Sequence, residues 1–328
     1  MHYGIPGFMQ KEEEDSKLEL DPVPGVLKQR VKRTLGHVII EYEASDKTRG
    51  LQILELPAFK HAHCSKFLFY CHAPDVASYV HTTNYACFLK NAWPSMRDDP
   101  QFFVCILHNV SHKFGYEWLS QNTLIIRRPN TGFDFGAFAD GLHFTSLDTV
   151  GQSLHNHHPL RVFFMNDTVY GPTFPWWMKQ RVAWTDVFGD MITEDVKLAG
   201  MTINPWFGTP HVQSMLMVTD HVGLEIGLRA KVFARRSDKN AVINESEAGF
   251  STAILKSGFN IDCAAELLHG FDYRVKTQIP RDLDDVTYDN RYAGFSVHPF
   301  ETVFSKTNRM HETLSKLLME HSEKIHTS

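Results

Sequence analysis

The sequence predicts an α/β fold built on a mostly parallel sheet. Four apolar runs have the length and composition of strands that are buried on both faces: KFLFYCHA (66–73), QFFVCILHNV (101–110), TLIIRR (123–128) and LRVFFMN (160–166). Helix-like stretches lie between the first two runs, at residues 78–93, and before the last run, around GAFADGLHFTSL. Strands that alternate with connections of this length are typical of βαβ units, whose strands are parallel.

Further elements precede and follow these strands. We expect a short helix at 26–35, a strand at HVIIEYEA (37–44), a strand pair at VKLAGMTIN (196–204) and VQSMLMVTD (212–220), a capped helix at ESEAGFSTAILKSGF (245–259) and an amphipathic helix at MHETLSKLLMEH (310–321). The strand pair would belong to a smaller, mixed part of the fold. Residues 1–25 have the composition of a mobile acidic tail, so we expect one domain over residues 26–328.

Composition and charge exclude several classes of protein. The 328 residues are 43% hydrophobic, which is enough for one substantial core. A net charge of −5 argues against a nucleic-acid partner, because dedicated nucleic-acid-binding proteins normally have a basic face. Five scattered cysteines without a CxxC pair indicate neither a zinc ribbon nor a disulfide framework. No apolar run approaches the ~18 residues of a membrane span, so we expect a soluble, cytoplasmic protein unless a Golgi anchor has been removed.

Several well-known catalytic motifs are absent from the sequence. It contains no GxxxxGK[ST], no GxGxxG after the first strand, no GxSxG and no HExxH. The histidine groups HAH (61–63) and HNHH (155–158) have no carboxylate partners at a recognisable spacing, which disfavours a zinc hydrolase. A different pattern must therefore carry the chemistry.

Polar residues follow two of the predicted strands at the point where each strand ends. RRPNTGFDFGAF comes after the third strand and offers Asn130 and Asp134 for polar contacts, with Gly132 to let the backbone approach a ligand. The fourth strand ends in Asn166 and Asp167. Each segment alone could also be a simple turn, since Asn, Asp and Gly populate turns for backbone reasons. Because parallel strands end at one edge of a sheet, where open α/β sheets bind ligands, we expect both segments to line one crevice.

Four segments in this order resemble the rhamnan-synthesis glycosyltransferase family and related eukaryotic and viral proteins: NTGFDFGAF, FFMNDTVYGP, HVQSMLMVTD and ESEAGFSTAILKSGFN. The similarity covers residues 66–260, and NDTVYGP together with HVQS is its specific part. The resemblance implies a GT-A-like fold, in which a Rossmann-like half binds a nucleotide-sugar and a carboxylate at a strand tip holds a divalent ion. It therefore implies two partners, a nucleotide-sugar donor and a glycan acceptor.

The resemblance also implies a cation. The diphosphate leaving group gains negative charge during transfer, and Mn²⁺ or Mg²⁺ neutralises such charge through oxygen ligands. Asp167 is the candidate metal ligand at the strand tip, and His298 in FSVHPFETVF is the candidate near the C-terminus. GT-A enzymes commonly carry D-x-D at this position, whereas this chain has Asn166-Asp167-Thr168, which makes the metal weaker or optional.

A sugar transfer that inverts the anomeric carbon needs a carboxylate base on the face opposite the leaving group. The resemblance places this base near the start of the helix that ends at Gly258, so Glu247 is the first candidate and Glu245 the second. Either Glu could instead stabilise the helix dipole from the first turn, without any chemical role. His211 and Gln213 lie two residues apart on one face of a predicted strand and are candidates for donor or acceptor contacts.

Through this resemblance we expect an inverting, metal-assisted glycosyltransferase of the hexosyl- or deoxyhexosyl-transferase class that acts in polysaccharide biosynthesis. Two other functions stay open. One is a nucleotide-binding α/β protein of different chemistry, such as phosphoryl transfer, and the other is a non-catalytic carbohydrate-binding scaffold. Trp176 and Trp177 are expected in the core, with stacking on a sugar ring as the alternative. The oligomeric state stays open.

Overall fold

The computed structural model describes residues 26–34, 37–44, 64–73, 84–97, 99–108, 123–145, 147–148, 160–178, 181–205, 209–280, 283–307 and 309. The predicted acidic tail, the predicted helix at 310–321 and the two histidine groups lie outside these residues. The assignment of residues 26–328 to one domain stays a prediction.

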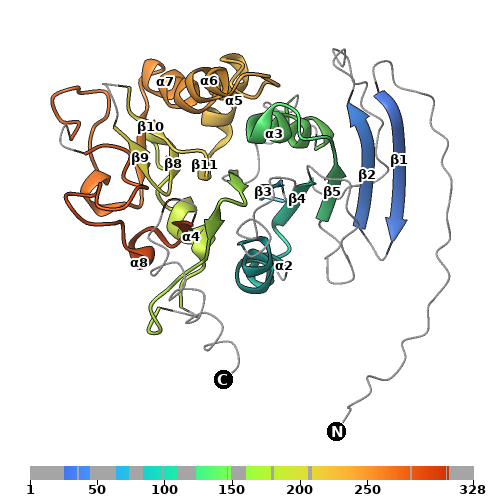
Figure 1. Ribbon diagram of the computed structural model, residues 1–328, viewed down its shortest axis with the longest axis horizontal. Coiled ribbons are helices and arrows are strands. Elements are labelled where there is room, and N and C mark those ends of the chain that lie inside the picture. The colour runs from blue at the N-terminus through green and yellow to red at the C-terminus, as the bar shows by residue number, and fades with distance from the viewer. Residues whose placement is uncertain are drawn as a thin grey trace, which may run out of the picture.

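Nine strands form one sheet in the described part of the chain, in the order β1-β2-β5-β4-β3-β6-β11-β8-β12 (Figure 1). Their bounds are β1 Val26–Thr34, β2 His37–Ala44, β3 Lys66–His72, β4 Phe102–His108, β5 Thr123–Arg127, β6 Arg161–Asn166, β8 Val196–Gly200, β11 Leu216–Thr219 and β12 Asn260–Cys263. β2, β5, β4, β3 and β6 run parallel to one another, and so do β8 and β12. The predicted α/β fold with a mostly parallel, Rossmann-like sheet is confirmed.

Two predictions differ from the structure. The helix expected at 26–35 is wrong, because residues 26–34 form β1, which pairs antiparallel with β2 and places Thr34 opposite His37. Pairing with a neighbouring strand satisfies backbone groups along the whole segment, whereas an isolated helix this short is marginal. The pair β8 and β11 belongs to the main sheet, so the smaller mixed part consists of two short pairs. These are β9 (Ile203–Asn204) with β10 (His211–Val212) and β7 (Val169–Tyr170) with β13 (Ser305–Lys306).

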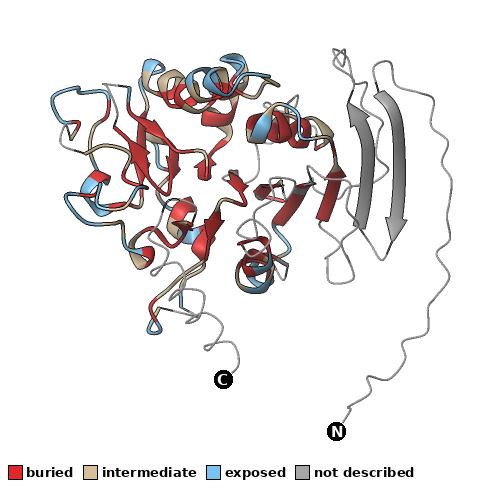
Figure 2. Cartoon of the chain, in the orientation of Figure 1, coloured by how far each residue is buried: buried red, intermediate tan, exposed pale blue. Residues whose placement is uncertain are grey.

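Helices cover both faces of the sheet (Figure 1). α3 (Phe133–Phe144), α5 (His221–Arg229), α6 (Lys239–Ala241) and α7 (Ala248–Lys256) lie on one face, and α2 (Trp93–Arg97) and α4 (Trp184–Gly189) lie on the other. Successive residues of β3 enter different cores: Phe67 and Phe69 pack under α3, whereas Leu68 and Tyr70 pack against α2. Figure 2 shows this burial along the central strands. Among the described residues, none of the helices is long and apolar enough to cross a membrane.

The strand order reverses beside β3. β4 and β5 lie on one side of β3, and β6, the next strand along the chain, lies on its other side. A reversal of this kind leaves a crevice outside the carboxyl ends of the two central strands, where open α/β sheets bind their ligands. His72 ends β3 and Asn166 ends β6, so both lie at this edge.

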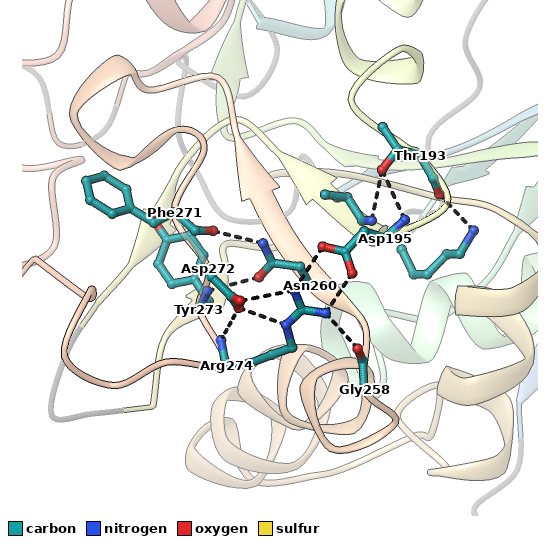
Figure 3. Close-up of polar contacts among 10 residues, drawn as sticks. Thr193, Asp195, Gly258, Asn260, Phe271, Asp272, Tyr273 and Arg274 are labelled. Carbon is teal, nitrogen blue, oxygen red and sulfur yellow. Dashed lines mark hydrogen bonds and ion pairs between the residues drawn. The ribbon is translucent and has the colours of Figure 1, made fainter.

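The opposite, amino edge of the sheet is held by an ion-pair network (Figure 3). Arg274 donates hydrogen bonds to both carboxylate oxygens of Asp195 at 2.6 and 3.0 Å, to Asp272 at 2.7 Å and to the Gly258 carbonyl at 2.8 Å. Asp195 directly precedes β8, and Gly258 lies between the end of α7 at Lys256 and the start of β12 at Asn260. The network therefore fastens the chain after β12 to the beginnings of two parallel strands.

Candidate active site

The end of β6 is held by a turn that Asn166 itself closes. Its Oδ1 accepts hydrogen bonds from the Thr168 amide at 3.2 Å and the Thr168 hydroxyl at 2.6 Å. Its backbone amide donates to the carbonyl of Met215, the residue after HVQS, at 3.1 Å, which ties the strand tip to this part of the chain. The Nδ2 group donates to Asp134 Oδ2 at 3.1 Å. The two predicted strand-tip segments therefore do meet, at the carboxyl edge of the sheet.

Asp134 lies in the first turn of α3. Its Oδ1 accepts the Phe135 amide at 3.0 Å. Burial raises the pKa of the Asp134 carboxyl, and the negative charge of Glu247 raises it further, although the bond from Asn166 acts in the opposite direction. Asp134 and Glu247 are thus close enough to interact electrostatically, although they belong to different helices.

Glu247 comes from a helical segment that begins earlier than predicted. α6 starts at Lys239 with Asp238 as its N-cap, a π-helical stretch follows over Val242–Glu247, and α7 continues to Lys256. Glu247 is therefore in the interior of this segment, so it does not stabilise a helix N-terminus. Its Oε1 accepts the Ser214 amide at 2.7 Å, which orients the carboxylate beside the HVQS segment.

The second candidate base, Glu245, has a different environment. Its carboxylate forms an ion pair with Arg236 at 2.9 Å, and its side chain is 64% exposed. The structure thus places Glu247 beside Asp134 in the crevice and Glu245 at the surface.

Gln213 joins the crevice to the C-terminal part of the chain. Its Oε1 accepts the Thr202 hydroxyl at 2.7 Å, and its Nε2 donates to Asp285 Oδ1 at 3.1 Å. Burial alone would raise the pKa of Asp285, but hydrogen bonds from Thr287 and the charge of Arg309 outweigh it, so this pKa lies below its ordinary value. Asp285 is therefore an ionised carboxylate held by surrounding donors.

Asp167 points to β3 rather than to Asp134. Its Oδ2 lies 2.7 Å from His72 Nδ1 and accepts the Ala73 amide at 2.8 Å. The side chain is almost fully buried, and Asn84 donates to the Asp167 carbonyl at 2.9 Å. Asp167 thus joins β6 to β3 at the strand reversal.

The predicted metal ligands lie in different surroundings. His298 is the N-cap of α8 (Pro299–Thr302), where its Nδ1 accepts the Phe300 amide at 3.1 Å. Asp167 Oδ2 is already engaged by two donors, so this conformation does not offer that oxygen to a cation. Within the described residues, no group of three or more His, Cys, Asp or Glu side chains is placed to hold a metal ion. The cation stays a prediction.

The remaining predicted donor-binding residues are Asn130, Gly132 and His211. Asn130 is exposed, and His211 is buried with its Nδ1 3.1 Å from the Thr209 carbonyl. Gly132 is the N-cap of α3 with φ +77°, and a Cβ there would lie 3.0 Å from the Arg235 Cα. Glycine is thus required by the loop itself, through both its backbone conformation and its packing.

Buried charges hold this loop in place. Asp140 in α3 accepts hydrogen bonds from Arg128 Nε at 2.6 Å and from Arg235 Nε at 3.0 Å. Arg128 also donates to the Thr131 carbonyl at 2.5 Å. The two Arg residues of the RRPNTG segment thus differ in role, because Arg128 is buried and positions the loop, whereas Arg127 ends β5.

Sequence reasoning missed several residues of the crevice. Each of them has only a weak signal in the sequence. His72 is the polar end of an apolar strand, and Ser214 follows Gln213 in HVQS. Asp285, Lys306 and Arg309 lie far from the matched motifs and reach the crevice only through the fold. The core placement of Trp176 and Trp177 is wrong, since they are 78% and 53% exposed.

A comparison with known protein families finds a match over the central part of the chain. A family model described as Rhamnan synthesis protein F matches residues 119–291, which is more than half of the chain and includes Asp134, Asn166, Gln213 and Glu247. No curated protein matches the chain. The matched region thus contains these four crevice residues, and the chain belongs to the rhamnan synthesis protein F family, a family of glycosyltransferase type.

Proposed function

We propose that this protein transfers a sugar from a nucleotide-sugar donor to a glycan acceptor. The observation that supports this best is that Asp134, Asn166 and Glu247, from three separate elements, lie together outside the carboxyl ends of the central strands. This is the place where a Rossmann-like sheet binds a nucleotide. Membership of a rhamnan synthesis family fits a role in polysaccharide synthesis. A cytoplasmic site of action is part of the proposal.

We propose that Glu247 is the general base and that the reaction inverts the configuration at the anomeric carbon. The Glu247 carboxylate takes the proton of the acceptor hydroxyl while the acceptor oxygen forms its bond to the anomeric carbon. The bond from that carbon to the diphosphate oxygen breaks on the opposite face, and the diphosphate leaves with the electron pair. The Ser214 amide orients Glu247 for this step. We place Asp134 and Asn166, which are hydrogen-bonded to each other, on the side of the site that binds the donor.

A divalent cation, Mn²⁺ or Mg²⁺, is part of this proposal through the family resemblance, with Asp167 and His298 as its predicted ligands. When bound, it would supply positive charge to the diphosphate. For Asp167, coordination through Oδ2 would require exchange of the contacts with His72 and Ala73. We derive no step through this cation.

Thermal melting in the presence of nucleotides tests the proposal. A ligand that binds only the folded state stabilises it by about 2.7 kcal/mol at a hundredfold excess over Kd. We expect one of UDP, GDP or dTDP to raise the melting temperature by ~2 °C or more, and the matching sugar nucleotide to be hydrolysed slowly without acceptor. A shift with ATP alone would favour phosphoryl transfer. If no nucleotide shifts the melt at saturating concentration, with or without Mn²⁺, the proposal is wrong and a scaffold role replaces it.

A further inference from the structure

A C-terminal segment of the chain lies against the tip of β6. β13 pairs antiparallel with β7, with Lys306 opposite Val169. The Thr307 amide donates to the Thr168 carbonyl at 3.3 Å, and Asn84 donates to the Thr307 hydroxyl at 2.9 Å. These contacts hold residues 305–307 beside the turn that Asn166 closes.

Lys306 brings a positive charge to a crevice rich in carboxylates. The charged groups that act on it are Arg309, Glu247, Asp285 and Asp134. Within the described residues its ammonium makes no hydrogen bond and no ion pair, so these carboxylates are near but not bonded to it. A lysine that has lost part of its hydration without gaining a bonded anion is unfavourable, unless a ligand supplies the anion.

Arg309, by contrast, already has its partners. It donates to Asp285 and, at 2.9 Å, to the Thr287 hydroxyl, and its guanidinium lies over the Tyr288 ring at 4.4 Å. Its backbone amide donates to the Lys306 carbonyl at 3.2 Å. Arg309 therefore fixes the segment that carries Lys306, and its like charge acts on the Lys306 ammonium.

A small pocket adjoins Lys306. It opens between the end of β8 and the C-terminal segment, and its lining includes Thr202, Thr287, Tyr288, Asp289, Ser296 and Lys306. The Thr202, Thr287 and Ser296 hydroxyls already donate to Gln213, Asp285 and Asp289. The ammonium of Lys306 is therefore the donor that this pocket offers to the oxygens of a phosphate group.

We propose that Lys306 is the cationic contact for the diphosphate of the nucleotide-sugar donor, and that Arg309 is the residue that positions it. This inference rests on the proposed function. The leaving oxygen gains negative charge as its bond to the anomeric carbon breaks, and the ammonium of Lys306 stabilises that charge by hydrogen bonding without giving up its proton. Lys306 would thus supply part of the positive charge that the diphosphate needs.

Binding measurements on single variants test the contact. Inorganic pyrophosphate is a probe that does not depend on the base, and UDP, GDP and dTDP are the nucleotide probes, each used with EDTA and with Mn²⁺. Lys306→Gln should weaken the binding of pyrophosphate and of the bound nucleoside diphosphate ~10-fold, because a charge-assisted bond is lost. Lys306→Arg should bind within ~3-fold of the unchanged protein, since it keeps the charge. Lys256→Gln, at an exposed position on α7, is the control and should change nothing.

The number of protons that the protein takes up when it binds the ligand is a second measurement. Burial and the charge of Arg309 lower the pKa of Lys306 to about 8, while Glu247, Asp285 and Asp134 oppose this shift. A bound diphosphate raises that pKa again, so binding near pH 8 should take up as much as about half a proton, measured by calorimetry in buffers of different ionisation enthalpy. Lys306→Gln and Lys306→Arg should both abolish this uptake, because neither side chain titrates there.

The two proposals fail differently. If the unchanged protein binds a nucleoside diphosphate and Lys306→Gln binds it equally well with the same proton uptake, the inference about Lys306 is wrong while the proposed function stands. If the unchanged protein binds neither pyrophosphate nor any of the nucleoside diphosphates, both are wrong. Loss of binding in Lys306→Gln with full recovery in Lys306→Arg supports the contact.

Discussion

The carboxylates of the crevice differ in the hydrogen bonds that each of them receives. Asp167 is bonded to His72 and Ala73, and Asp285 is surrounded by Gln213, Thr287 and Arg309. Glu247 receives one described hydrogen bond, from the Ser214 amide, and faces another carboxylate. A base needs an orienting contact and a lone pair that is available to the substrate, and Glu247 combines the two.

The two glutamates of the helical segment should therefore behave differently. Glu247→Gln should lower transfer by ~10²-fold or more while donor affinity stays within a few-fold, because a base acts on the acceptor. Glu245→Gln removes only a surface ion pair and should keep nearly full activity. Transfer rates and nucleotide titrations on both variants check this, and equal activity in the two would exclude Glu247 as the base.

Asp167 should matter for stability as well as for any role at the site. Asp167→Asn removes the charge from a buried contact with His72, so we expect the free energy of unfolding to fall by about 1–3 kcal/mol. Urea denaturation measures this, with Asp190→Asn at an exposed position as the control. Unchanged stability would show that the bonds at Asp167 Oδ2 contribute little. A transfer assay across a Mn²⁺ titration then tests the predicted metal role separately.

At the scale of elements, the site depends on two segments that depart from regular geometry. The helix that carries Glu247 contains a π-helical stretch over Val242–Glu247, and a π-helical turn shifts the side chains that follow it. The loop before α3 contains two successive residues with positive φ, Gly132 at +77° and Phe133 at +56°. Such a conformation persists only where the surroundings hold it, here through Arg128, Asp140 and Arg235.

Two glycine variants separate the backbone and packing contributions of this loop. Gly132→Ala places a Cβ 3.0 Å from the Arg235 Cα at a φ of +77°, whereas Gly258→Ala has a φ of +88° with nothing within 4 Å. Both should lose about 1 kcal/mol for the left-handed backbone, and Gly132→Ala should lose a further ~1 kcal/mol through the close contact. Chemical denaturation measures the difference. Only Gly132→Ala should also weaken nucleotide binding, and equal losses in both variants would contradict the packing argument.

At the scale of the whole molecule, stability and chemistry are concentrated at opposite edges of the sheet. The crevice lies at the carboxyl edge, where β3 and β6 end, and the Arg274 network lies at the amino edge, where β8 and β12 begin (Figure 3). The strands between them are buried on both faces by the helical layers (Figure 2). The crevice residues can therefore vary in chemistry while the network and the core maintain the sheet.

Arg274→Ala should test this separation. It removes a bidentate contact with Asp195 and a bond to Asp272, yet both carboxylates are partly exposed, so we expect a loss of about 1 kcal/mol that shrinks at high salt. Hydrogen bonds from Arg274 lower the pKa of Asp272, so the ionised pair contributes above the ordinary aspartate pKa of about 3.9 and its contribution disappears as the pH falls below it. Nucleotide binding should be unchanged, and a binding defect would contradict the separation.

Much of the fold could be predicted because its signals are local. The runs at β3, β4, β5 and β6 are continuous and apolar, and each forms the expected strand within one or two residues. Segment 26–34 could not be assigned in this way, because its pairing with β2 outweighs a weak local preference. The motifs of the site were also visible, and Asn166, Asp134 and Glu247 do come together. Gln213 directly precedes Ser214, whose amide donates to Glu247.

The sequence alone does not show in which direction each side chain points. Asn166 and Asp167 are neighbours at one strand tip, yet a strand turns successive side chains apart, so one meets Asp134 and the other meets His72. Lys306 reaches the crevice only because β13 pairs with β7, a contact between segments far apart in the chain. Periodicity and composition are local properties and suffice for the strands, the helices and the family. The electrostatic environment of Glu247 and Lys306 is a sum over residues from many segments, and it exists only once the chain has folded.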